Sequence, residues 1–95
     1  MMLEPQFDLG RVFVTPAVLD SLDDDLTLIF GLIDRHVCCD FGDLCPEDLE
    51  ANQQALIFGD RLLSSYDLPD PHSLTVWVIT EADRSATTVL LPSDY

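Results

Sequence analysis

Ten consecutive residues, His36 to Cys45 (HVCCDFGDLC), contain all three cysteines of the chain and one of its two histidines. Imidazole and thiolate groups are preferred zinc ligands, and thiols also carry redox chemistry. The spacing is H-x-C-C-x5-C, whereas structural zinc sites usually combine two ligand pairs, each separated by a short turn. His36, Cys38 and Cys39 fall at a predicted helix end, where successive side chains point about 100° apart. The pattern therefore favours packing over a metal or redox site, and we expect neither a metal ion nor a cofactor.

Two predicted turns nearer the C-terminus contain residue types that hydrolases use. They are Asp70, His72 and Ser73 in the first turn, and Glu81, Asp83, Arg84 and Ser85 in the second. Catalytic partners usually converge from distant segments, and the chain has neither a G-x-S-x-G motif nor a glycine-rich phosphate loop. A pairing of Arg84 with Glu81 or Asp83 explains the second turn more simply. The sequence predicts a protein that is not an enzyme, with a small enzyme using Glu81 to Ser85 and His72 as the alternative.

Acidic residues dominate the composition. The chain has eighteen acids, four arginines and no lysine, which gives a formal net charge of −14. Ten of the acids lie between Asp20 and Glu50. Helix neighbours three or four residues apart stand about 5 to 6 Å from one another, near the spacing of phosphates along a DNA strand. Asp43, Glu47 and Glu50 have this spacing. The candidate partner-binding residues are Asp23, Asp24, Asp25, Asp40, Asp43, Glu47, Asp48 and Glu50. A simpler interpretation is that the acids maintain solubility, as in a salt-rich cytoplasm, or that some of them only begin helices.

The net negative charge restricts the kinds of molecule that this protein can bind. A strongly negative field repels nucleic acid and attracts basic protein surfaces, so we expect a basic protein partner and no direct nucleic-acid binding. The longest apolar stretch, Leu26 to Ile33, is far shorter than the roughly 20 residues that cross a bilayer, so we expect no membrane association. The N-terminus lacks the features of a signal peptide, and three cysteines cannot all pair internally, which favours a cytoplasmic location.

The elements that must position these residues can be read from the pattern of apolar residues. The 95 residues are enough for one small domain. The predicted elements are a strand at residues 10–15, a short helical turn at 16–22, helices at 25–39 and 46–58, and strands at 61–68, 74–80 and 87–91. This order, β-α-α-β-β-β, predicts an α+β domain with a short N-terminal strand, two main helices and a three-stranded antiparallel meander, the whole sheet being antiparallel.

Capping residues mark the predicted helix ends. Thr15 precedes a proline at the first helical position, and Asp25 is an N-cap for the next helix. Gly42 breaks that helix, Pro46 begins another, and Gly59 ends it. In the second main helix, Ala51, Ala55 and Phe58 lie along one side and Leu49 and Leu56 along another, which predicts partial burial.

The segment Val76 to Tyr95 (VWVITEADRSATTVLLPSDY) resembles a family of small acidic bacterial proteins encoded largely on plasmids and other mobile elements. The similarity extends to VTPAVLDSL, RHVCCDFGDL, Asn52 and RLLSSYDL, and so covers nearly the whole chain. Family members carry small or polar residues where this chain has Cys38, Cys39 and Cys45, which implies that cysteine chemistry is not their common task. A place on mobile elements implies a role in transfer, maintenance or defence against host immunity, and several anti-defence proteins are acidic mimics of DNA.

These observations lead to one hypothesis and two alternatives. The hypothesis is a noncatalytic inhibitor from a plasmid or phage whose acidic face occupies the basic DNA-binding groove of a host defence protein, such as a CRISPR effector or a restriction enzyme. The first alternative is a plasmid-maintenance enzyme. The second is an oligomeric accessory protein, such as a homodimer, in which Tyr66, Trp77 and Tyr95 form a self-association surface.

Overall fold

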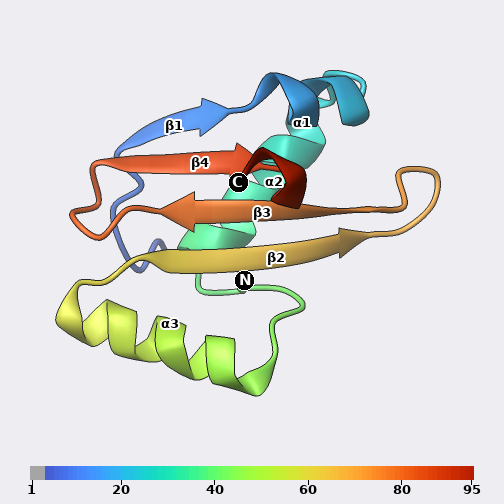
Figure 1. The fold of residues 1–95 in the computed structure, drawn as a ribbon. Coiled ribbons are helices and arrows are strands. Elements are labelled where there is room, and N and C mark those ends of the chain that lie inside the picture. The colour runs from blue at the N-terminus through green and yellow to red at the C-terminus, as the bar shows by residue number, and fades with distance from the viewer. Residues whose placement is uncertain (1–3) are drawn as a thin grey trace.

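A four-stranded sheet organises the computed structural model, which describes residues 4–95 (Figure 1). The elements in chain order are β1 (Arg11–Val14), α1 (Pro16–Ser21), α2 (Leu26–Val37), α3 (Pro46–Phe58), β2 (Leu62–Leu68), β3 (Leu74–Thr80), β4 (Ala86–Leu90) and the 3-10 helix η1 (Pro92–Asp94). The predicted α+β class is confirmed, and the predicted elements are present with boundaries shifted by at most two residues.

The strand order is β1-β4-β3-β2, so β3 is an interior strand, and both alternating sets of its residues are largely apolar, as is typical of a strand packed on both faces. β2, β3 and β4 form the expected antiparallel meander. The expectation of an entirely antiparallel sheet is wrong, because β1 pairs in parallel with β4, from Arg11 beside Ala86 to Val14 beside Val89. The physical reason is the long return path. Three helices and the β2–β3 hairpin separate β1 from β4, so no tight turn forces these strands to be antiparallel.

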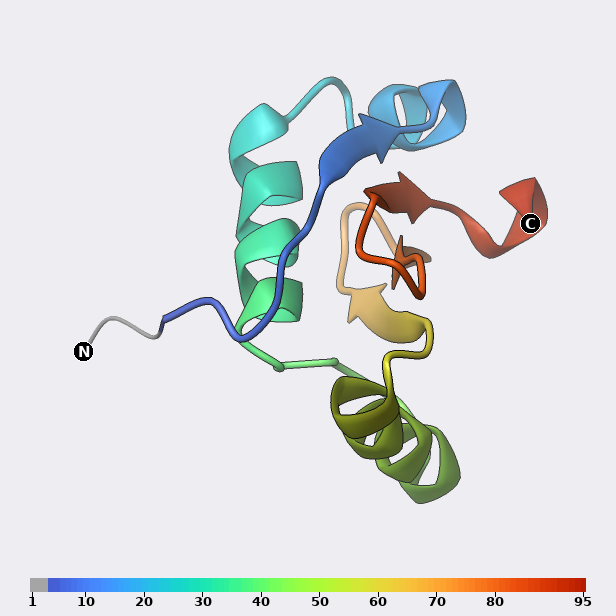
Figure 2. The same ribbon diagram turned by 90° about the vertical axis from the view of Figure 1, so that its left-hand side faces the viewer.

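α2 covers one face of the sheet, and the main core lies between them (Figure 2). Ile29, Leu32 and Ile33 of α2 pack there against Val76 and Val78 of β3. The helix begins where predicted, with the Asp25 carboxylate accepting a hydrogen bond from the backbone N–H of Leu28 at 3.1 Å. α1 likewise begins at Thr15, whose hydroxyl accepts a hydrogen bond from the N–H of Val18 at 3.3 Å.

α3 lies alongside the β2 edge of the sheet rather than over either face (Figures 1 and 2). Its buried residues are Asn52 and Ala55, while Ala51 and Phe58 are exposed, so only Ala55 of the predicted apolar side packs inward. The partial burial is confirmed. The buried face differs from the predicted one because the prediction used apolar residues alone, whereas the polar residue Asn52 forms the contact with β2. Gly59 ends the helix in the left-handed conformation, as predicted.

Asn52 attaches α3 to β2 through two hydrogen bonds to one residue. Its side-chain amide donates to the carbonyl of Leu63 at 2.6 Å, and its side-chain carbonyl accepts from the N–H of Leu63 at 3.1 Å. We expect Asn52→Leu to lower the free energy of unfolding by about 2 kcal/mol, because both backbone groups lose their partner in a half-buried place. Urea denaturation measures this. Gln53→Leu, on the exposed side of the same helix, is the control and should change stability by less than about 0.5 kcal/mol.

Within residues 4–95, no helix has the length and apolar character needed to cross a membrane.

Candidate acidic interface

All eighteen acidic side chains of the chain are exposed. Three of the four arginines are engaged by the fold. Arg35 pairs with Asp40, Arg61 donates to the Tyr95 hydroxyl at 2.7 Å, and Arg84 donates to backbone carbonyls. The negative charge is therefore displayed on the surface, while most of the positive charge serves internal contacts.

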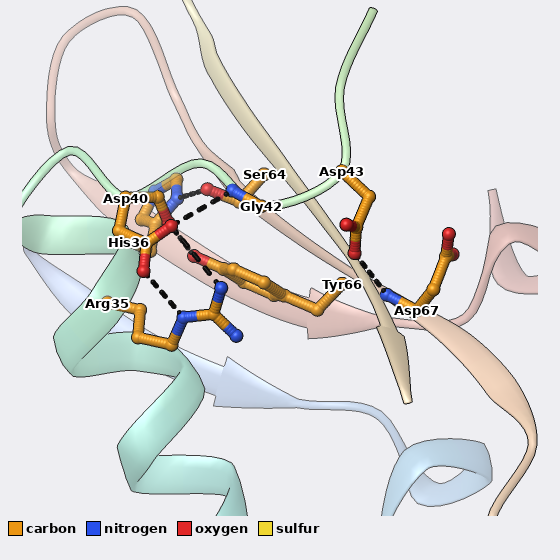
Figure 3. Close-up of polar contacts among 8 residues, drawn as sticks. All are labelled: Arg35, His36, Asp40, Gly42, Asp43, Ser64, Tyr66 and Asp67. Carbon is orange, nitrogen blue, oxygen red and sulfur yellow. Dashed lines mark hydrogen bonds and ion pairs between the residues drawn. The ribbon is translucent and has the colours of Figure 1, made fainter. Parts of the chain in front are cut away.

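The end of α2 holds one of the candidate acids in a defined geometry (Figure 3). Asp40 accepts hydrogen bonds from Arg35 at 2.8 and 3.3 Å, and both side chains are about half exposed, at 51% and 46%. This contact lowers the pKa of Asp40 and raises the pKa of Arg35. Arg35 also stacks on the ring of Tyr66, 4.5 Å from its centroid. The Tyr66 hydroxyl donates to the Asp40 carbonyl at 2.6 Å, and burial raises the pKa of this phenol to about 12.

The segment after Asp40 lies along the outer edge of β2 (Figure 3). Ser65 donates its N–H to the Phe41 carbonyl at 3.1 Å and accepts at its carbonyl from the N–H of Asp43 at 2.7 Å. The Asp43 carboxylate then accepts from the N–H of Asp67 at 2.9 Å. Asp43 thus has a structural role, since it occupies a backbone donor that an edge strand would leave open.

Glu47, Asp48 and Glu50 lie at the beginning of α3 and are exposed. Their side chains make no hydrogen bond or ion pair with another residue in the described range. Glu47 and Asp48 occupy the first helical turn, where negative charge is favourable at the positive end of the helix dipole. These three carboxylates are the candidate residues that remain unengaged beside the β2 edge.

Asp23, Asp24 and Asp25 precede the first residue of α2, whereas Asp40 follows its last residue. The 12 residues of this helix span about 18 Å at about 1.5 Å per residue. Asp23 and Asp24 have positive φ angles of 52° and 56° in the turn before Asp25. The eight candidate acids therefore form two separate groups and not one continuous face.

His36 is fully buried in a chain of hydrogen bonds that the sequence does not reveal. Its Nδ1 lies 2.5 Å from the Ser64 hydroxyl and its Nε2 2.8 Å from the Thr80 hydroxyl, which is 2.7 Å from the hydroxyl of Thr87. Thr87 donates to the carbonyl of Leu9 at 2.7 Å. Each hydroxyl has one hydrogen, so Thr80 must donate to Thr87 and accept from His36. The imidazole therefore carries its proton on Nε2 and accepts from Ser64 at Nδ1.

This assignment makes His36 a structural residue. Burial lowers its pKa to about 4, with a further contribution from the positive charge of Arg84. The rings of Phe7 and Phe41 pack edge-on against the imidazole, with centroids 5.2 and 6.0 Å away. A serine beside a histidine resembles part of a hydrolase site, but both side chains are fully buried, so a substrate has no access to them.

The cysteines do not converge. Cys38 ends α2, Cys39 follows in a left-handed conformation, and Cys45 precedes α3. Among residues 4–95, no group of three or more histidine, cysteine or acidic side chains could hold a metal ion. Burial raises the pKa of the Cys39 thiol, which is opposite to what a reactive cysteine needs.

The predicted pairing of Arg84 with Glu81 or Asp83 is wrong. The guanidinium donates instead to four backbone carbonyls, those of Ala55, Asp60, Glu81 and Ala82. One planar guanidinium can donate to several carbonyls at a helix end and a turn. These hydrogen bonds contribute more to stability than an exposed ion pair does. Asp83 bonds instead to Ser85, and these hydrogen bonds lower the pKa of its carboxyl.

The open face of the sheet carries a shallow pocket of about 210 Å³. It is lined by Arg61, Ile79, Glu81, Thr88, Leu90 and Tyr95. Glu81 is the one member of the predicted catalytic group in this lining. Tyr66 is buried in the core and Trp77 packs against the ring of Tyr95 at 5.9 Å. The three aromatics therefore do not form the predicted self-association surface, because the alternation of side chains along a strand turns Tyr66 inward.

Comparison with known proteins gave no match among the protein-family models, the curated proteins or the solved structures searched. The resemblance to plasmid-encoded acidic proteins stays a prediction.

Proposed function

We propose that this protein is a noncatalytic inhibitor that binds a basic, nucleic-acid-binding surface of another protein. The observation that carries the proposal is the exposure of all eighteen acids while three of the four arginines are engaged by the fold. Like charges at this density cost stability, so a binding role gives a reason for keeping them. The resemblance to mobile-element proteins suggests a host defence protein as the partner, such as a CRISPR effector, in the cytoplasm of a bacterium.

The dimensions of the molecule support mimicry of DNA. Its longest extent is 36 Å, over which duplex DNA carries about 21 phosphate charges at about one per 1.7 Å. The formal charge of −14 is of the same order. A groove that binds DNA would therefore meet a comparable charge on an object of comparable length.

The centre of the binding face in this proposal is the beginning of α3. Glu47, Asp48 and Glu50 are exposed and unengaged, whereas Asp40 and Asp43 are occupied by Arg35 and by the N–H of Asp67. The enzyme alternative has less support, because the shallow pocket contains Glu81 but not Asp83, Ser85 or His72.

Reversing the three unengaged acids should abolish partner capture. We expect Glu47→Lys/Asp48→Lys/Glu50→Lys to retain no partner in an affinity pull-down from host lysate, because the attraction between opposite charges is removed. Wild-type capture should fall between about 0.1 M and about 1 M salt, as the Debye length drops from about 10 to about 3 Å. Circular dichroism must show that the variant is folded, since positive charge in the first turn costs up to about 1 kcal/mol per residue.

The matched control is Glu4→Lys/Asp8→Lys/Glu81→Lys, which makes the same change in net charge at exposed acids outside α3. Equal loss of capture in both triple variants would indicate a nonspecific effect of net charge. Undiminished, salt-insensitive capture by the α3 variant would contradict the proposal.

A further inference from the structure

The two edge strands of the sheet, β2 and β1, differ in whether another segment covers their outer edge. The outer edge of β2 is covered by residues 41–43 and by the Asp43 carboxylate. No strand within residues 4–95 pairs with the outer edge of β1. An open strand edge presents unpaired N–H and C=O groups and is a template for pairing with another strand.

The register of β1 identifies the groups that point outward. Arg11 donates its N–H to the Ser85 carbonyl at 2.9 Å, and Thr15 donates to Val89 at 3.0 Å. Because strand residues alternate in direction, Phe13 also points its backbone groups toward β4, whereas Val12 and Val14 point theirs away from the sheet. Val14 packs against the main core. The side chain of Phe13 therefore lies on the face of the sheet away from this core, where it is 50% exposed.

We propose that the free edge of β1 pairs with β1 of a second copy of this chain, in an antiparallel, two-fold symmetric dimer. Pairing through the outward groups aligns Val12 with Val14 of the second copy and places the two Phe13 residues opposite each other on the axis. This is a pair without mutual hydrogen bonds, in which Cα atoms approach to about 4.5 Å and the side chains are closest. Two exposed aromatic rings thus contact each other across the strands.

Charge complementarity favours a second copy over an unrelated strand. In this register Arg11 stands opposite Thr15 of the second copy, on the same face of the sheet. The Thr15 hydroxyl donates to the Asp94 carboxylate at 2.8 Å, so this carboxylate comes within reach of the guanidinium across the axis. Arg11 is the arginine whose side chain makes no hydrogen bond or ion pair within the described residues. Two Arg11–Asp94 pairs would form, one on each side of the axis.

The same surface is where two copies repel each other least. No acid occurs from Leu9 to Leu19, the segment that contains β1. Each copy nevertheless carries a formal charge of −14, which opposes association over the range of a Debye length. A four-residue strand also buries little area. The dimer is therefore weak and is strengthened by salt, opposite to the binding of a basic partner.

Sedimentation equilibrium over micromolar to millimolar protein tests this proposal. The average mass should rise with concentration toward twice the 10.6 kDa of one chain, and more steeply at about 1 M than at about 0.1 M salt. Val12→Pro should weaken association at least about tenfold, because it removes an outward N–H without breaking a hydrogen bond inside the fold. Val12→Thr is the control and should associate like the wild type.

A second pair of variants keeps the test independent of proline. Phe13→Glu should abolish the dimer by placing two carboxylates on the axis, whereas Phe13→Tyr should retain it. A monomer at every concentration and salt, or a dimer that resists both Val12→Pro and Phe13→Glu, overturns the proposal. These variants lie outside α3, so they should leave capture of the basic partner unchanged, and the two proposals can fail separately.

Discussion

Replacing Gly42 with alanine should lower the free energy of unfolding by about 3 kcal/mol, from backbone strain and overpacking together. Gly42 has a φ of +78°, a conformation that residues with a side chain rarely adopt. A Cβ atom at this position would lie 2.2 Å from the Ser65 carbonyl oxygen and 2.6 Å from the ring of Tyr66. The oxygen belongs to the backbone of β2 and cannot rotate away, so residues 41–43 would have to leave the edge of the strand.

Gly59 provides a matched control for this prediction. It has nearly the same φ, +79°, but a Cβ there would meet no atom within 4 Å. Gly59→Ala should therefore cost only the backbone strain, about 1 kcal/mol. Urea denaturation of both variants separates the two contributions. Equal destabilisation of the two would show that the close approach to β2 adds nothing.

The loss of residues 41–43 from the edge has a second consequence. It would expose the backbone groups of Ser65 and Asp67, which Phe41 and Asp43 now satisfy. Uncovered edge strands associate with other chains. We expect Gly42→Ala, but not Gly59→Ala, to scatter light on mild heating.

The second large effect is a loss of stability on mild acidification, caused by His36. Its pKa is about 4 in the fold and about 6.5 in the unfolded chain, so the unfolded state binds the proton more tightly. The stabilisation is complete above pH 6.5 and is lost as the pH falls toward 4. A difference of about 2.5 pKa units corresponds to about 3 kcal/mol, of which about 2 kcal/mol disappears between pH 7 and pH 5.

Burial is the largest reason that protonation of His36 is costly, and the geometry of the hydrogen-bond chain is consistent with it. A proton added at Nδ1 would face the Ser64 hydroxyl, which already donates to that nitrogen. The positive charge of Arg84 also opposes a second cation nearby. The window from pH 7 to pH 5 contains most of the His36 effect, because most of this window lies between the unfolded and folded pKa values of this residue.

Thermal unfolding of wild type and His36→Gln between pH 5 and pH 7 measures the contribution. The variant should be less stable at pH 7 but should not lose stability toward pH 5, because glutamine keeps a donor and an acceptor without titrating. His72→Gln, in the turn between β2 and β3, is the matched control, because it replaces the other histidine of the chain at a position outside this hydrogen-bond chain. If His36→Gln does not fold, an NMR titration of the wild-type imidazole is decisive, and a midpoint near 6.5 would overturn the assignment.

The sequence alone determined the elements and the amount of charge. Thr15, Asp25, Pro46 and Gly59 end or begin helices through their own backbone and side-chain chemistry, so local reasoning was sufficient to place them. Residues 74–80 are likewise apolar in both of their alternating sets, which is typical of an interior strand such as β3. The net charge of −14 follows from composition and needs no structure.

Only the tertiary structure decided which groups meet. The partners of His36 are 28 and 44 residues away in the sequence, so no spacing rule could have joined His36 to Ser64 and Thr80. The parallel pairing of β1 with β4 likewise depends on how three helices and a hairpin return the chain. For the same reason, the sequence does not show which acids have hydrogen-bond partners and which have none. Asp43 is an example, because only the position of β2 brings the N–H of Asp67 to its carboxylate.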